Sequence, residues 1–385
     1  MNTHHGGLPL DGVRVIEFTH MVMGPTCGMI LADLGAEVIK VEPPGGDKTR
    51  HLPGLGIGFF RSFNRNKKSV VLDIQTPEGL ASARELIGAS DVLIENFRPG
   101  LMDRLGLGHE ALSLDFPRLI CVSHKGFLPG PYEDRLALDE VVQNMAGLTY
   151  MTGPPGRPLR AGSSVNDIMG GMFGAIGVLA ALRERERSGR GQTIQSALFE
   201  NCCLLAAQHM QQHLMTGEVP PPFPARVSAW SVYDTFEVAE GQQLFIGAVS
   251  DKQFLALCGV LGRDDLARDP DLASNAQRVA RRPGLLAELA RTLRDHAIDP
   301  LCEHLQAAGL PYAKVVRPDQ LVHDEHLLHS GGLVPMDTDG GGTTQVVLLP
   351  LLMGGRRLGV RHPLAAVGEH TEALLGRRTA PSSSA

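Results

Sequence analysis

The sequence predicts an α/β fold with a Rossmann-like, doubly wound large domain and a smaller α+β domain. Short apolar, β-branched stretches alternate with helix-like patterns as far as residue 127, which is typical of a parallel sheet covered by helices. Four prolines then lie within 218–226, which indicates a stiff, extended linker. With 385 residues, the chain is long enough for two or three domains of ordinary size.

Turn residues place the first β-α-β unit. Strands are expected at 12–18 and 36–42, where β-branched residues alternate with other side chains. Between them, Pro25 suits the first helical position and Gly35 suits the helix C-terminus, so the two strands should be parallel. Further strands are expected at 68–74, 91–97 and 118–127, with a helix that opens at 76–78. Ligands of such a sheet bind at the carboxyl ends of its strands.

The rest of the chain is expected to form long helices, a linker, a small domain and a returning segment. Long helices are predicted at 167–188 and 197–216, a hairpin with its turn at Glu240-Gly241, and helices near 251–261, 282–297 and 299–308. We expect a large domain at 1–217, a linker at 218–225, a small α+β domain at 226–330, a segment at 331–376 that returns to the large domain, and a flexible tail at 377–385.

Composition excludes several classes of partner. The chain is 43% hydrophobic with 45 glycines, which fits a globular α/β enzyme. Its net charge of −6 argues against nucleic acid or an anionic membrane as partner. The longest apolar run, 168–182, is shorter than the ~20 residues that span a bilayer, and no secretory signal is recognised. Six cysteines without a CxxC pair indicate reduced thiols, so a cytoplasmic protein is expected.

Asp167 is the acid that raises the main question about function. It lies at the head of 168–182, a run made only of apolar residues and glycine. One interpretation is a helix N-cap, a role that Asn166 could also fill. The other is a nucleophilic carboxylate at a helix N-terminus, which could form a covalent acyl intermediate with an activated substrate such as a thioester. Spacing alone leaves both open.

Two other chemistries are disfavoured. A dehydrogenase would need G-x-G-x-x-G after the first strand, but that loop offers only Gly24 and Gly28. His323 and His326 could suggest a metal, but their leucine-rich surroundings indicate an ordinary amphipathic segment, so no metal site is predicted.

Several stretches together resemble the class III coenzyme A-transferase family, which includes formyl-CoA transferases, carnitine and bile-acid CoA-transferases and α-methylacyl-CoA racemases. They read "LPLDGVRVIEFTHMVMGPTCGMILADLGAEVIKVEPPGGD", "NRNKKSVVLDIQTPEG", "DVLIENFRPGLMDRLGLG", "LICVSHKGF", "NDIMGGMFGAIGVLAALRERERSGRGQTIQSAL" and "GEHTEALL". The resemblance implies that Asp167 attacks an acyl-CoA to give an aspartyl–acyl anhydride and then an aspartyl-CoA thioester. It also implies an interlocked homodimer, with the coenzyme A thioester as substrate and no tightly bound cofactor.

The resemblance also assigns a CoA site at the carboxyl ends of the strands. The residues implied are His20, Met21, Leu72, Asp73, Ile74, Gln75, Asn96, Phe97, Arg104 and Lys125. Arg104 offers a bidentate fork for phosphate and Lys125 a point charge.

Racemases of the family place a histidine just before an aspartate, where this chain has Leu138 before Asp139. Leucine cannot accept a proton, so transfer is favoured over racemisation. Formyl-CoA transferases typically carry polar residues after the "FTH" triplet and a glycine-rich loop in the small domain. This chain has Val22 and Met23 at the first place, and only Gly247 in "FIGAVSDKQF" at the second. Formate and oxalate are therefore doubtful as substrates, and a larger acid is favoured, such as a dicarboxylate with succinyl-CoA as donor. A racemase or a non-catalytic CoA-binding homologue stays open as an alternative.

Overall fold

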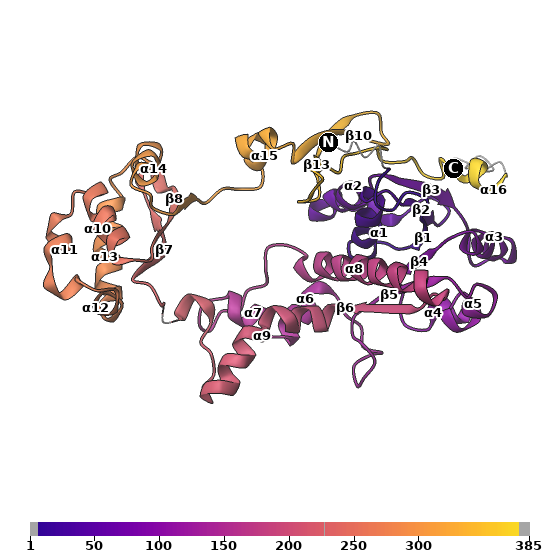
Figure 1. Cartoon of the computed structure of the whole chain (residues 1–385), viewed down its shortest axis with the longest axis horizontal. Helices are drawn as coiled ribbons and strands as arrows, with labels where there is room; N and C mark the ends of the chain where they lie inside the picture. Colours follow the sequence, from indigo (N-terminus) through magenta and orange to yellow (C-terminus); the bar gives the residue numbers. More distant parts are fainter. Residues whose placement is uncertain (1–6, 227, 377–385) are drawn as a thin grey trace. The chain divides into compact units, whose positions relative to one another are not determined.

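The computed structural model describes residues 7–226 and 228–376 (Figure 1). These residues form two compact units. The first contains the chain up to Ala225 and again from Glu325 onward, and the second is Arg226–Asp324. The chain therefore leaves the first unit once and comes back to it.

A six-stranded parallel sheet forms the centre of the first unit. Its strands are β1 (Arg14–Phe18), β2 (Glu37–Glu42), β3 (Lys67–Val71), β4 (Val92–Glu95), β5 (Ile120–Lys125) and β6 (Thr193–Ala197). They lie in the order β3-β2-β1-β4-β5-β6, and all neighbouring pairs are parallel. The predicted α/β fold with a parallel sheet is confirmed. The order reverses between β1 and β4, where such sheets open a crevice for ligands.

Helices cover both faces of this sheet (Figure 1). The helices of this unit are α1 (Met23–Asp33), α2 (Phe59–Phe63), α3 (Pro77–Gly88), α4 (Leu101–Arg104), α5 (His109–Asp115), α6 (Asp139–Met145), α7 (Leu148–Thr152), α8 (Val165–Ser188), α9 (Leu198–Thr216), α15 (Glu325–His329) and α16 (Thr371–Leu375). On one face, Leu31 of α1 and Val178 of α8 pack with Val15 of β1. On the other, Leu86 of α3 and Leu112 of α5 share a core. Strands buried on both faces are rich in apolar, β-branched residues, as in "VLI" of β4, which is why they were recognisable.

Element boundaries depart from expectation in three places. Helix α1 begins at Met23, so Pro25 is its third residue and not its first. Strand β6 was not predicted, because "TIQSA" is polar and largely exposed at the sheet edge. Phe223–Ala225, inside the Pro-rich stretch, forms a short 3-10 helix and is not wholly extended. By contrast, Thr76 caps α3 as expected and accepts a hydrogen bond from Gly79 N at 3.1 Å.

Among the described helices, only α8 is long and apolar enough to cross a bilayer, counting length and composition alone. It exceeds the predicted apolar run because it begins at Val165 and continues through charged residues to Ser188. Its buried residues, including Gly171, Gly174 and Val178, face α1 and the sheet. One face of α8 is therefore packed in the core of the unit, although Met172, Phe173, Ile176 and Leu179 are exposed.

The second unit is a small α+β domain. Strands β7 (Val232–Glu237), β8 (Gln243–Ala248) and β9 (Tyr312–Lys314) form an antiparallel sheet. Its helices are α10 (Asp251–Val260), α11 (Asp264–Arg268), α12 (Asn275–Ala280), α13 (Arg282–Leu293) and α14 (Ile298–Ala307). The predicted hairpin is confirmed, and both Glu240 and Gly241 at its turn have positive φ. Strand β9 was not predicted, because three residues carry no clear alternation.

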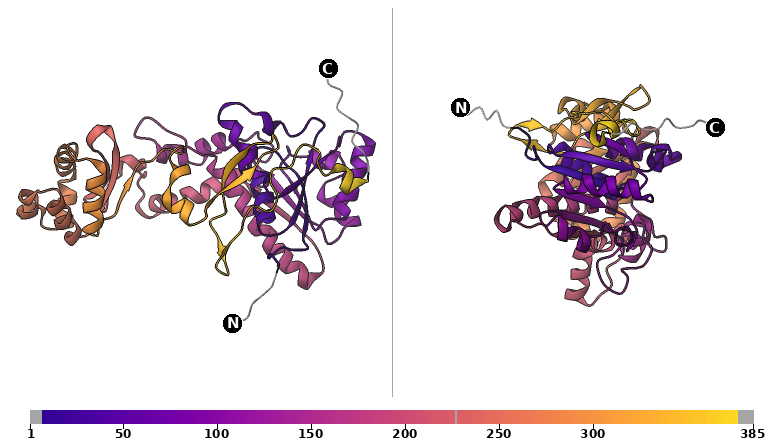
Figure 2. Two further views of the ribbon diagram at one scale, coloured as in Figure 1. Left: turned by 90° about the horizontal axis from the view of Figure 1, so that it is seen from above. Right: turned by 90° about the vertical axis from the view of Figure 1, so that its right-hand side faces the viewer.

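The C-terminal segment belongs to the first unit. It contains two antiparallel pairs, β10 (Leu333–Asp337) with β11 (Thr343–Val347) and β12 (Leu352–Met353) with β13 (Arg356–Arg357). Helix α16 lies beside β3, where Val71 N donates to Thr371 Oγ1 at 3.0 Å and His370 N donates to Ser69 O at 2.9 Å. Figure 2 shows this yellow segment next to the indigo and purple strands. The tail predicted at 377–385 lies outside the described residues.

Candidate active site

The turn after β1 and the turn after β4 meet at the point where the strand order reverses. His20 N donates to Asn96 Oδ1 at 3.1 Å, and Asn96 Nδ2 donates back to His20 O at 2.8 Å. The rings of His20 and Phe97 stack with their centroids 6.2 Å apart. Desolvation by the surrounding protein lowers the pKa of His20, although part of the residue is exposed to solvent. Three residues of the predicted CoA site are thus brought together at the position where doubly wound sheets bind ligands.

The other predicted CoA residues are distributed along the same edge. Leu72 is buried in the core, whereas Asp73 and Gln75 are exposed in the turn after β3, two strands from β1. Arg104 is exposed at the end of α4. Lys125 lies 2.7 Å from Glu95 Oε1, so its charge is already paired.

Lys125 Nζ also donates to the Phe97 carbonyl oxygen at 3.0 Å. It therefore fixes the loop after β4 while it is held by Glu95. Of the two predicted basic residues, Arg104 is the one whose guanidinium is exposed to receive a phosphate. Ile74, between Asp73 and Gln75, is half-buried against the core.

Asp167 is the third residue of α8, and the cap interpretation of it is wrong. The N-cap residue is Ser164, which makes no side-chain capping bond. The first backbone amides of the helix donate instead to Asp139 Oδ2, from Asn166 N at 2.9 Å and from Asp167 N at 3.2 Å. Asp139 is the first residue of α6 and is buried. A carboxylate from another helix therefore caps α8.

Gln143 holds this capping carboxylate in place. Its amide Nε2 donates to Asp139 Oδ1, and its Oε1 accepts from Ala161 N at 2.8 Å. Asp139, Gln143 and Ala161 thus form a chain of hydrogen bonds under the first turn of α8. Because both partners of the Gln143 amide are fixed, the orientation of the cap is fixed as well.

The surroundings of Asp167 make its carboxyl group unusually basic. Burial is the largest cause, and the charges of Asp139 and Glu140 add to it, so that the pKa of Asp167 is raised to about 7. At neutral pH a substantial fraction is ionised, and a poorly solvated carboxylate of high pKa is a good nucleophile.

Glycine allows the start of α1 to lie directly against the first turns of α8. A Cβ placed on Gly171 would lie 2.6 Å from the carbonyl oxygen of Met23, so a side chain there would push the helices apart. Met23 follows His20 and Met21 by only a few residues. The turn of the predicted CoA site and the helix end that carries Asp167 are therefore neighbours.

Sequence reasoning missed Asp139 and Gln143 as functional residues. Asp139 was considered only as the residue after Leu138, and no local spacing signals a cap supplied from 27 residues away. Within the described ranges, no group of three His, Cys, Asp or Glu side chains is placed to hold a metal, and the expectation that His323 and His326 bind none stays a prediction.

Comparison with known proteins identifies the family. The model of CoA-transferase family III matches residues 10–371. The chain is 32% identical to a succinyl-CoA–D-citramalate CoA-transferase of Chloroflexus aurantiacus, over 97% of this chain and 95% of that protein. It is 34% identical to a succinate–glutarate CoA-transferase of Agrobacterium fabrum, over 95% of each. It is also 37% identical to an acetyl-CoA:oxalate CoA-transferase of Acetobacter aceti, over 85% of this chain and 87% of that one.

Solved structures agree with this result. A crystal structure of a CaiB/BaiF family protein from Brucella suis is similar with a TM-score of 0.88 and 32% identity, covering 96% of this chain and 99% of that one. The predicted resemblance is confirmed over nearly the whole chain. The chain belongs to CoA-transferase family III, and it is a CoA-transferase.

Proposed function

We propose that Asp167 is the nucleophile of this transferase. Its ionised carboxylate attacks the thioester carbonyl of the donor, the C–S bond breaks, and a mixed anhydride and CoA thiolate form. The thiolate then attacks the Asp167 carbonyl, which releases the first acid as its carboxylate and leaves an aspartyl-CoA thioester. The acceptor carboxylate attacks that thioester to form a second anhydride, and the thiolate finally attacks the acyl carbonyl of the acceptor. Acyl-CoA leaves and the Asp167 carboxylate is restored.

The position of Asp167 is the observation that carries this proposal. Its backbone amide is held by Asp139, so its side chain is not used as the cap. The N-terminus of α8 also favours the negative charge that develops on the attacked carbonyl oxygen. We place CoA along the turns after β1, β3 and β4, with Arg104 as a phosphate contact.

Trapping the intermediate tests the nucleophile. Wild-type protein given acyl-CoA should be modified at Asp167 by hydroxylamine, and the Asp167→Asn variant should not be. Transfer by this variant should fall at least about 10³-fold, because an amide cannot follow the covalent route. Asp115→Asn, an exposed aspartate of α5, is the control and should retain activity. Near-wild-type transfer by Asp167→Asn, with deamidation excluded by mass spectrometry, would refute the proposal.

For substrates, we propose succinyl-CoA as donor and a dicarboxylate larger than oxalate as acceptor. Two of the relatives above are named for succinyl or succinate transfer, to D-citramalate and glutarate. Acetyl-CoA as donor and oxalate as acceptor are the second candidate pair, because one relative is named for them. A panel of these donors and acceptors, measured by CoA exchange, decides between them. A preference for monocarboxylic acceptors would contradict both candidate pairs, since each has a dicarboxylate as acceptor.

We also propose that the protein is a homodimer, interlocked as the resemblance implies. One face of α8 leaves Met172, Phe173, Ile176 and Leu179 exposed in the single chain. A contiguous apolar face of this kind marks a protein interface. Ile176→Glu should give monomers in sedimentation, whereas Leu114→Glu, on exposed α5, should not. A monomeric wild type would refute this.

The cysteines bear on the compartment. All six are free, which supports our expectation of a reducing, cytoplasmic setting.

A further inference from the structure

The turn between β1 and α1 contains a backbone conformation that needs support. Met21 has φ of 63°, in the left-handed region, although it is not glycine, asparagine or aspartate. Its side chain is 40% exposed, so core packing does not impose the conformation. Strained residues of this kind persist only where the surroundings hold them, and they gather at functional sites.

Among the residues that the structure describes, one side chain is hydrogen-bonded to the backbone of this strained residue. Met21 N donates to Thr49 Oγ1 at 3.1 Å. Thr49 is buried in the short 3-10 helix Lys48–His51, and its own amide donates to Asp47 Oδ1 at 2.9 Å. Asn96 makes two hydrogen bonds to the backbone of the neighbouring His20. The exposed turn is thus held by two side chains, one at each of its two exposed residues.

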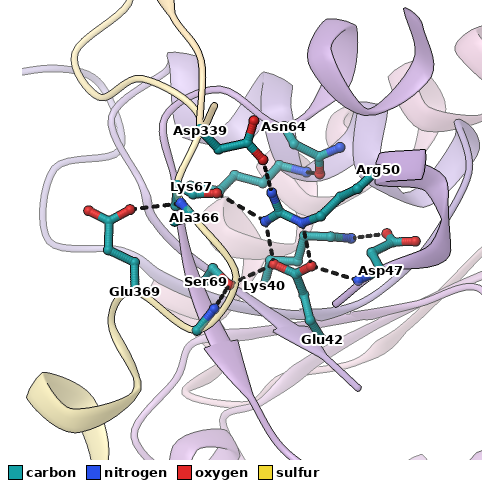
Figure 3. Close-up of polar contacts among 12 residues, drawn as sticks. Lys40, Glu42, Asp47, Arg50, Asn64, Lys67, Ser69, Asp339, Ala366 and Glu369 are labelled. Atoms are coloured by element: carbon teal, nitrogen blue, oxygen red, sulfur yellow. Dashed lines mark hydrogen bonds and ion pairs between the residues drawn. The ribbon is translucent and has the colours of Figure 1, made fainter. Parts of the chain in front are cut away.

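Asp47, which accepts the hydrogen bond from the Thr49 amide, belongs to a buried network of charges (Figure 3). Lys40 Nζ lies 2.9 Å from Asp47 Oδ2 and donates to the carbonyl oxygen of Thr19 at 2.7 Å. Asp47 N donates to Glu42 Oε2 at 2.8 Å. Lys40 therefore connects Thr19, at the start of the turn, to Asp47, which orients Thr49. Charges buried this deeply require fixed partners, so the arrangement is rigid.

The same network extends to the C-terminal segment of the unit. Arg50 donates to both carboxylate oxygens of Glu42, at 2.7 and 2.6 Å. It also pairs with Asp339 at 2.7 Å and donates to the Ala365 carbonyl oxygen at 3.0 Å. Figure 3 shows the Arg50 guanidinium between Glu42 and the returning segment. Through Arg50, the C-terminal segment is therefore bonded to the charge network that orients Thr49.

We infer that Thr49 is a positioning residue for CoA transfer: oriented by Asp47 and Lys40, it holds Met21 in the left-handed conformation and so preorganises the turn that receives CoA. This inference rests on the proposed placement of CoA at that turn. Without the Thr49 hydroxyl, the turn would populate other conformations. Apparent CoA affinity would then fall in proportion to the fraction of chains that remain competent.

Thr49→Val and Thr49→Ser form a matched pair of variants. Valine keeps the shape and burial of threonine but removes the acceptor oxygen, whereas serine retains it. For Thr49→Val we expect Kd for CoA by calorimetry, and KM for acyl-CoA, to rise about three- to tenfold, the range of one lost hydrogen bond. We expect kcat to change less, because Asp167 is held separately. Thr49→Ser should bind CoA like wild type.

A second pair of variants tests whether Thr49 acts through the conformation of Met21. Glycine adopts positive φ without strain, so Met21→Gly should reduce the effect of Thr49→Val. The quantity compared is the ratio of Kd with valine to Kd with threonine, measured with Met21 and again with Met21→Gly. We expect a clearly smaller ratio in the glycine background. An equal ratio in the two backgrounds would overturn the inference.

Other results separate this inference from the function on which it rests. If wild-type protein does not bind CoA, the proposed site fails. If wild type binds and Thr49→Val binds equally well, only the positioning role fails, even where the melting temperature has dropped. If Thr49→Val does not fold, Thr49→Ala, which also lacks the acceptor oxygen, replaces it in both backgrounds, and an equal Kd ratio with Met21 and with Met21→Gly would again overturn the inference.

Discussion

Asp167→Asn should stabilise the protein at alkaline pH while it abolishes turnover. Burial and the charges of Asp139 and Glu140 raise the pKa of Asp167 from 3.8 to about 7. Below pH 3.8 the carboxyl group is protonated in both the folded and the unfolded chain, and it has no effect on stability. Between pH 3.8 and about 7, the unfolded chain loses this proton while the folded chain retains it. The free energy of unfolding therefore falls as pH rises, and above about 7 the loss is constant.

The size of this loss can be bounded. Each pKa unit corresponds to about 1.4 kcal/mol, so a fully desolvated carboxyl group would lose about 4 kcal/mol. Asp167 is partly exposed, and solvent screening reduces the expected value to about 1–2 kcal/mol. Asparagine does not ionise, so the variant avoids the loss. For a unit of this size we expect its melting temperature to exceed that of wild type by about 2–6 °C at pH 8.

Calorimetric melting of CoA-free wild type and variant at pH 5 and pH 8 measures the effect. The difference in melting temperature should be larger at pH 8, and the pH 5 pair serves as the internal control. A helix cap would give the opposite sign, since an ionised aspartate at a helix N-terminus is favoured over asparagine at high pH. A variant that is less stable than wild type at pH 8, or equally shifted at both pH values, would refute this account of Asp167.

Three further predictions follow from single residues. Arg104→Ala should weaken CoA binding by about 1–3 kcal/mol, and less for dephospho-CoA if Arg104 contacts the 3′-phosphate; unchanged calorimetric affinity for both would exclude that contact. Asp139→Asn removes a charge that raises the pKa of Asp167, so the acid limb of the pH–rate profile should move to lower pH. An acid limb that does not move would show that the charge of Asp139 has no influence on the group that titrates. Because Leu138 cannot accept a proton, a 2-methylacyl-CoA should not exchange its α-proton with deuterated water; exchange as fast as CoA transfer would restore the racemase alternative.

Much of the large unit could be predicted because its strands are buried on both faces. "VLI" in β4 is apolar throughout and "VIKV" in β2 is β-branched except for Lys40, and such runs between helical patterns indicate a parallel sheet. Strand β6 could not be recognised, because an edge strand with polar, exposed residues has neither feature. Helix α1 was placed two residues late, because Pro25 is tolerated anywhere in the first turn, where amides have no helical partner.

The candidate site could be predicted only where local position determines it. His20 lies two residues after β1 and Asn96 directly follows β4, so the strand ends that the resemblance pointed to do lie at one edge of the sheet. Asp139 and Thr49 act through hydrogen bonds to residues 28 positions away, Asp167 and Met21. Contacts of that separation leave no periodic signal in a sequence, and they depend on tertiary packing alone.

The separation of the cap from the nucleophile explains why two acids lie together at the end of α8. If Asp167 itself capped the helix, backbone N–H groups would donate to its carboxylate, lower its pKa and make it a weaker nucleophile. Asp139 accepts those N–H groups instead, at 2.9 and 3.2 Å, so the helix end is satisfied without the Asp167 side chain. The charge of Asp139 then acts in the opposite direction on its neighbour and raises the pKa of Asp167. One buried carboxylate thus stabilises the helix that carries the proposed nucleophile and raises the pKa of that group, at the cost of some folding stability above neutral pH.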